Sequence, residues 1–98
     1  MIVNYTDWVQ FDDDTFHRHF YPAVPLGNDY TKRVRYITVE FDYDWAYVLI
    51  TEEDKEDDWC ALEIFTDRNK RIRRENVLRA IDILFDLPPA NNAPTYDE

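Results

Sequence analysis

The chain has 98 residues, of which 45% are hydrophobic and 16% aromatic, and its net charge is −10. This length and composition suit one folded domain with its own core and argue against intrinsic disorder. The negative charge argues against direct binding to nucleic acid or to an anionic membrane, because both would repel the protein.

The first third of the chain predicts a short strand, a short helix and a loop. Residues 1–11 are rich in β-forming side chains and predict the strand. Asp12–Asp14 then precede Phe16 and Phe20, which are four residues apart. Acidic residues suit a helix start, and residues four apart share a helical face, so this segment predicts a short N-terminal helix. Residues 22–30 contain two prolines and the only glycine, and they predict a loop.

The middle of the chain predicts two neighbouring strands. Residues 34–42 alternate between the two faces of a strand, and Ile37, Val39 and Phe41 form the expected core face. Residues 45–51 are apolar almost without interruption and predict a central strand.

A third strand follows at residues 59–66, and it contains the lone cysteine, Cys60. Because this cysteine lies within an apolar pattern, we expect it to be a small buried side chain. The connections at residues 42–44 and 52–58 are short and acidic. Short connections favour antiparallel neighbours, so the three strands predict a β-meander.

The last third predicts one amphipathic helix at residues 74–87, stopped by Pro88 and Pro89. Residues 88–98 have no periodicity and predict a flexible tail after a single domain at 1–87. The apolar stripe of the helix is expected to contain Val77, Leu78, Ile81, Leu84 and Phe85.

Together these elements predict an α+β fold. The expected architecture is an antiparallel three- to four-stranded β-meander, with the C-terminal α-helix packed on one face and a short N-terminal helix. The lone cysteine favours a reducing compartment, and no apolar run reaches the ~20 residues of a membrane helix. We therefore expect a cytoplasmic protein.

Catalytic and metal-binding motifs are weak. The chain has no serine and one glycine, which excludes a serine nucleophile and a glycine-rich phosphate loop. Residues 54–58 resemble the start of a calcium loop, but Trp59 stands where that loop needs glycine. Asp12–Asp14 with His17 and His19 leave a divalent metal open, although a capped helix explains them more simply. We expect no enzyme activity and no cofactor.

The acidic charge is concentrated in residues 36–66, which contain ten acidic residues and one base and so carry −9 of the total −10. Alternate residues of an extended strand are about 6.6 Å apart, close to the spacing of phosphates along a nucleic-acid strand. Large aromatic residues within a charged patch are typical binding anchors. The predicted partner-binding residues are Glu40, Asp42, Tyr43, Asp44, Trp45, Glu52, Glu53, Asp54, Glu56, Asp57, Asp58 and Trp59.

A basic segment follows at residues 68–79, with six of the eleven bases. Beside so acidic a sheet, these bases are expected to balance carboxylates within the chain or on a second subunit. Phosphate binding is the weaker alternative.

The charge pattern favours an inhibitor that binds the basic, nucleic-acid-binding surface of another protein. Such a nucleic-acid mimic would use its charge for fast association and its aromatic residues for slow dissociation. Viral anti-CRISPR and anti-restriction proteins, acting in the cytoplasm of the host cell, are one such class. Alternatives are an immunity protein that neutralises a nuclease toxin, and a homodimeric interaction subunit without inhibitory activity. The same charges would also serve simply to keep a small protein in solution.

Overall fold

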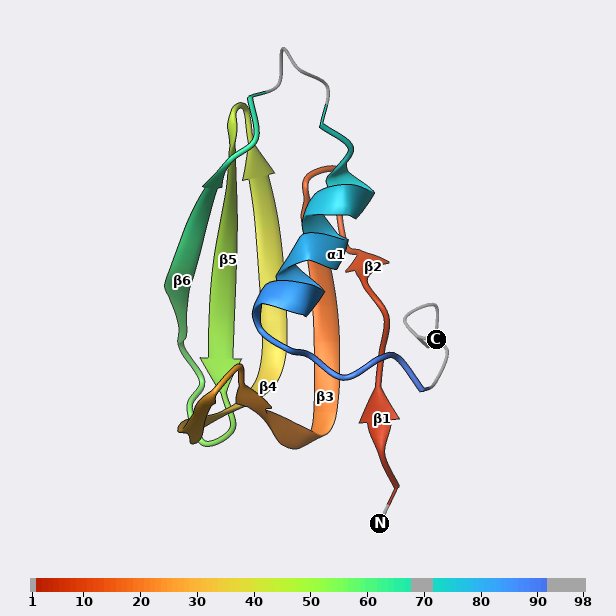
Figure 1. Cartoon of the computed structure of the whole chain (residues 1–98), viewed down its shortest axis with the longest axis vertical. Coiled ribbons are helices and arrows are strands. Elements are labelled where there is room, and N and C mark those ends of the chain that lie inside the picture. Colours follow the sequence, from red (N-terminus) through yellow and green to blue (C-terminus); the bar gives the residue numbers. More distant parts are fainter. Residues whose placement is uncertain (1, 68–71, 92–98) are drawn as a thin grey trace.

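The computed structural model describes residues 2–67 and 72–91. Six strands form one antiparallel sheet, and a C-terminal helix lies across one of its faces (Figure 1), so the fold is a sheet-rich α+β fold. The order along the sheet is β1-β3-β4-β5-β6, and β2 also pairs with β3. The elements are β1 (Asn4–Tyr5), β2 (Val9–Gln10), β3 (Thr15–Leu26), β4 (Asp29–Asp42), β5 (Trp45–Glu52), β6 (Asp58–Phe65) and α1 (Arg74–Leu84).

The predicted meander is present as β4, β5 and β6, which pair with their sequence neighbours. The reversal between β4 and β5 lies at Tyr43 and Asp44, with a left-handed φ of 52° at Tyr43. Ile37, Val39 and Phe41 face the core as predicted. The core is formed by Phe20, Val24, Leu26, Val34, Ile37, Val39, Phe41, Ala46, Val48, Ile50, Val77, Leu78, Ile81 and Leu87.

The predicted N-terminal helix is wrong, because the segment belongs to β3. Residues four apart share a face in a strand as well as in a helix, so the spacing of Phe16 and Phe20 fits both. In the structure both rings pack on the core, and Phe16 lies opposite Val39 of β4. An isolated two-turn helix is marginal in water, whereas β3 gains a ladder with β4 and a buried face.

The sheet has six strands instead of the three or four predicted, in part because the segments predicted as a helix and a loop are extended. Residues 22–26, predicted as loop, continue β3, and the chain reverses only at Gly27, whose φ is 57°. A left-handed conformation is what glycine adopts at little cost. Two short strands, β1 and β2, pair with the other edge of β3 and complete the sheet.

The predicted C-terminal helix is present but ends at Leu84. Val77, Leu78 and Ile81 are buried against the sheet, whereas Leu84 is exposed. Leu87, beyond the helix, is buried instead and extends the apolar contact. In the described part of the chain, no helix is long and apolar enough to cross a membrane.

The predicted burial of Cys60 is wrong, because this side chain is exposed. A β-bulge shifts the pairing of β6: Val48 lies opposite Leu62, but the next residue, Leu49, lies opposite Cys60. Ala61 is therefore the extra residue, and the strict alternation expected for residues 59–66 breaks at this point. Cys60 ends on the face of the sheet that the helix does not cover.

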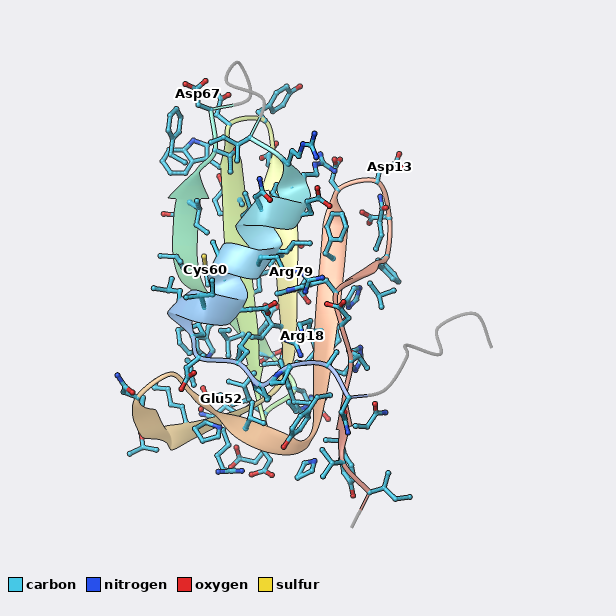
Figure 2. All side chains as sticks on the ribbon, turned by 45° about the vertical axis from the view of Figure 1, so that its right-hand side comes forward. Asp13, Arg18, Glu52, Cys60, Asp67 and Arg79 are labelled. Atoms are coloured by element: carbon cyan, nitrogen blue, oxygen red, sulfur yellow. The ribbon has the colours of Figure 1, made fainter. Side chains whose placement is uncertain are left out.

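A buried arginine, Arg18, joins the N-terminal segment, β3, α1 and the chain after α1 (Figure 2). Its side chain is 2% exposed. Its Nε donates to the Thr6 carbonyl, Nη1 to the Asp82 carboxylate and Nη2 to the Pro88 carbonyl, at 2.6, 2.9 and 2.8 Å. Asp82 on α1 also accepts a hydrogen bond from Trp8 Nε1 at 3.0 Å. Each of the three guanidinium nitrogens thus donates a hydrogen bond inside the protein.

The first residues of the predicted tail contact the sheet edge. Besides the contact of Pro88 with Arg18, the backbone N–H of Asn91 donates to the Tyr5 carbonyl at 2.9 Å. The Asn91 side chain in turn accepts a hydrogen bond from the Tyr5 N–H. The rest of the predicted tail, residues 92–98, lies outside the described residues.

Candidate functional site

The acidic residues of the central segment lie at two opposite ends of the sheet. The β4–β5 turn and the β5–β6 turn are separated by the length of β5, eight residues or roughly 23 Å. In Figure 2, Asp13 and Asp67 mark the first end and Glu52 marks the second. The predicted partner-binding residues therefore form two separate surfaces, one at each end of β5.

We call the first of these the hairpin-end surface. It contains the predicted residues of the β4–β5 hairpin together with the loop between β2 and β3 and the end of β6. Its members are the carboxylates of Asp12, Asp13, Asp14, Glu40, Asp42, Asp44 and Glu63 and the rings of Tyr43, Trp45, Tyr47 and Phe65.

The β2–β3 loop is fixed against the hairpin by specific contacts. The Phe41 N–H donates to the Asp14 carbonyl at 2.8 Å, and Arg74 Nη2 bonds the Asp14 carboxylate at 2.7 Å. Arg74 Nη1 also donates to the Asp13 carbonyl. The loop and the hairpin together line an open depression of about 630 Å³. Its lining residues are Asp12, Asp13, Asp14, Thr15, Glu40, Phe41, Asp42 and Tyr47.

The hairpin-end surface presents charge and aromatic area together. Tyr43 is 77% exposed, Phe65 57% and Trp45 41%. The Trp45 and Phe65 rings meet edge to face, with centroids 5.3 Å apart. Hydrogen bonds from the Asp14 N–H and the Thr15 hydroxyl hold the pKa of Asp12 below its ordinary value, so this carboxyl is ionised throughout the neutral range.

Three carboxylates of this surface, those of Glu40, Asp42 and Glu63, take part in no ion pair within the described part of the chain. Their charge is therefore available to a partner. Arg74 is the described base that contacts this surface, and it pairs with Asp14.

We call the second surface the turn cluster. It contains Glu52, Glu53, Asp54, Glu56, Asp57, Asp58 and Trp59.

Three bases at the start of β4 lie beside the turn cluster. Arg35 donates to the Glu52 and Lys55 carbonyls, and the Arg33 carbonyl accepts from the Glu53 N–H. Lys32 Nζ lies 4.9 Å from the centroid of the Trp59 ring. The Arg35 and Lys32 cations weaken the negative potential of the cluster.

Trp59 is not an exposed anchor. Its ring packs against the core, and its Nε1–H donates to the Glu52 carboxylate at 2.9 Å. Of the three predicted aromatic anchors, the structure therefore exposes Tyr43 and Trp45 at the hairpin end and holds Trp59 in internal contacts.

No known protein family, characterised protein or solved structure matched this chain. The site is therefore interpreted from its own geometry.

Several residues of the hairpin-end surface were missed as binding residues from the sequence. Asp12–Asp14 were assigned to a helix start, and Tyr47, Glu63 and Phe65 were assigned to strands without a role. The sequence signal that could have identified them is the alternation of side chains along a strand. Once the β5–β6 register is known, this alternation places Glu63 opposite Tyr47 and Phe65 opposite Trp45. The bulge at Ala61 hides that register in the sequence.

The basic segment partly fulfils its predicted internal role. Arg74 pairs with Asp14, and Arg79 pairs with Asp7 at 2.8 Å. The hydrogen bonds from Arg79 hold the pKa of Asp7 below its ordinary value, against the opposing effect of burial. Arg68, Lys70 and Arg71 lie outside the described residues.

The metal hypothesis for Asp12–Asp14, His17 and His19 gains no geometric support. Among the described residues, no group of three His, Cys, Asp or Glu side chains could hold a metal ion. The two histidines instead pack on the helix-free face around Tyr36, whose ring centroid lies 5.0 Å from His17 and 4.4 Å from His19. The Tyr36 hydroxyl hydrogen-bonds Nδ1 of His17.

This histidine pair predicts a loss of stability at mildly acidic pH. Burial lowers the pKa of both residues below 6.5; Asp12 partly opposes this at His17, whereas His17 and Arg35 add to it at His19. The unfolded chain therefore takes up these protons at a higher pH than the folded protein. The free energy of unfolding has its full value above pH 6.5 and decreases as the pH is lowered from 6.5. Urea unfolding between pH 8 and about pH 5 should show this decline.

The control is the double variant His17→Gln/His19→Gln, which should have a nearly flat unfolding midpoint over the same interval. Asp7 and Asp12, whose pKa values are lowered, cause a separate decline only below the ordinary aspartate pKa of 3.8. An equal decline in the variant would contradict the role of the two histidines.

Proposed function

We propose that this protein is a small acidic inhibitor that occupies the basic, nucleic-acid-binding surface of another protein. The observation that carries the proposal is the hairpin-end surface, where seven carboxylates and four aromatic rings gather on three neighbouring strands and one anchored loop. We place its action in the cytoplasm, in the host cell if the gene is viral, and we propose no enzymatic activity.

The physical support is preorganisation. Glu40 and Asp42 are alternate residues of a paired strand, so their side chains share a face about 6.6 Å apart. The β2–β3 loop adds three carboxylates, and Arg74 and Phe41 hold the backbone of this loop at Asp13 and Asp14. Groups fixed before binding lose little conformational entropy on association. A rigid row of anions is what a groove built for phosphates binds.

The exposed aromatic rings distinguish this surface from one whose charge only keeps the protein in solution. A solubilising surface needs charge but no exposed tryptophan, tyrosine and phenylalanine side by side. Exposed rings within a charged rim are typical of the residues that supply most binding energy.

The test is affinity capture followed by competition. The tagged protein is incubated at low salt with an extract of the cells in which it is made, and captured proteins are challenged with duplex DNA or RNA. We expect nucleic acid to release one nucleic-acid enzyme, and the purified inhibitor to block that enzyme's nucleic-acid binding in return.

Two results would count against the mimic. A partner that only high salt releases, and that still binds nucleic acid, would favour an immunity protein that binds beside the active site. Capture of untagged copies of the same chain alone would favour a homo-oligomeric interaction subunit.

A further inference from the structure

The helix-free face of the sheet ends in a regular patch at the hairpin end. Cross-strand pairing places Asp42, Trp45 and Phe65 in one row, on β4, β5 and β6 respectively. The next row on the same face, one step further from the β4–β5 turn, contains Glu40, Tyr47 and Glu63. We call these six residues the two-row patch.

Each ring on β5 has carboxylates on neighbouring strands. Tyr47 lies between Glu40 and Glu63, and Trp45 lies next to Asp42. Strands in a sheet are about 4.8 Å apart, so each carboxylate is close to the edge of the neighbouring ring. A ligand over a ring can therefore reach a carboxylate without leaving the ring face.

This arrangement suits a guanidinium better than an ammonium. The guanidinium is planar and weakly hydrated, so it can stack on a ring while its N–H groups bond a carboxylate at the ring edge. The ammonium of lysine is a compact, strongly hydrated charge that gains less from stacking.

The protein already contains this combination twice. Arg74 Cζ lies 4.8 Å from the centroid of the Phe41 ring while its Nη2 bonds Asp14. Arg18 Cζ lies 4.8 Å from the Phe20 ring while its Nη1 bonds Asp82. In both places one arginine stacks on an aromatic ring and pairs with a carboxylate at the same time.

We propose that the two-row patch binds arginine side chains of a basic partner and prefers them to lysine. This inference rests on the proposed function and extends it, because it names the side chain recognised and places the contact at the hairpin end. The occupant is a partner segment rich in arginine, because three carboxylates that form no ion pair with any described residue, together with exposed rings, complement the charge and the plane of guanidinium groups.

The probes are octa-arginine and octa-lysine, which carry equal charge. Each peptide is titrated into the ¹⁵N-labelled full-length protein at low salt, and amide and indole chemical shifts are followed. We expect octa-arginine to bind about tenfold more tightly, with the largest shifts at Trp45, Tyr47 and Glu63.

Variants separate stacking from bulk charge. Trp45→Leu should reduce the octa-arginine affinity to about that of octa-lysine, while Tyr21→Ala, which removes an exposed ring elsewhere on β3, should leave both affinities unchanged. Glu63→Gln, a second variant with little effect on shape, should weaken octa-arginine more than octa-lysine. Thermal unfolding of each variant checks the fold.

Different failures have different meanings. Equal affinity for both peptides, or largest shifts at the turn cluster, would overturn the arginine preference and leave the proposed function standing. If neither peptide binds at low salt, the inference and the proposed binding of a basic surface both fail.

Discussion

Asp82→Ala is expected to destabilise the protein by about 3–5 kcal/mol, because it leaves the buried guanidinium of Arg18 without its counter-charge. It also removes the acceptor of the Trp8 indole N–H. A domain of this size has a total stability of about 5–15 kcal/mol, so the change should lower the melting temperature by about 15 °C or more. Thermal and urea unfolding followed by circular dichroism measure the effect.

The matched control is Arg79→Ala on the same helix. Arg79 also contacts Asp82, at 3.5 Å, but its side chain is exposed and its partner Asp7 is half-buried. Exposed ion pairs contribute at most about 1 kcal/mol, so this variant should remain near the wild-type stability. Similar losses in both variants would contradict the special role of the buried Arg18–Asp82 pair.

Reversing the two alternate carboxylates of β4, with Glu40→Lys/Asp42→Lys, is expected to weaken binding to the captured partner by about 100-fold. The change places two positive charges against a basic surface, and such like-charge contacts cost several kcal/mol. Both side chains are exposed, so the fold should be preserved. Surface plasmon resonance gives the affinity, and unfolding curves check the fold.

The control reverses two exposed acids of the turn cluster, with Glu53→Lys/Asp54→Lys. Both double variants raise the net charge from −10 to −6, so they affect long-range attraction about equally. The control should therefore lose no more than about fivefold, mainly through slower association. A larger loss in the control than in the β4 variant would move the interface to the turn cluster.

The part of the fold that local pattern could predict is the meander. In β4, Ile37, Val39 and Phe41 alternate with polar residues, and the turns on either side of β5 are short, so neighbouring strands pair through local contacts. The C-terminal helix could also be predicted from the sequence, because Val77, Leu78 and Ile81 recur at helical spacing.

Elsewhere local pattern was ambiguous. Phe16 and Phe20 share a face in either conformation, and only the pairing of β3 with β4 decides between them. Arg18 stands between these two rings in the sequence, and nothing in the local pattern indicates that it is buried. Its burial depends on Asp82, 64 residues later, and on backbone carbonyls that no sequence pattern displays.

Some features of the candidate site follow from the sequence, and others only from the tertiary structure. Composition and order alone determined that nearly all of the net charge lies in residues 36–66 and that Tyr43 and Trp45 stand among acidic residues. Only the tertiary structure decided that Asp12–Asp14, Glu63 and Phe65 join the β4–β5 end. Charge and residue type can be taken from neighbouring residues in the sequence, whereas the placement of side chains next to one another on a sheet depends on strand order and register. A single bulge at Ala61 is enough to reverse which side chains of β6 lie on each face of the sheet.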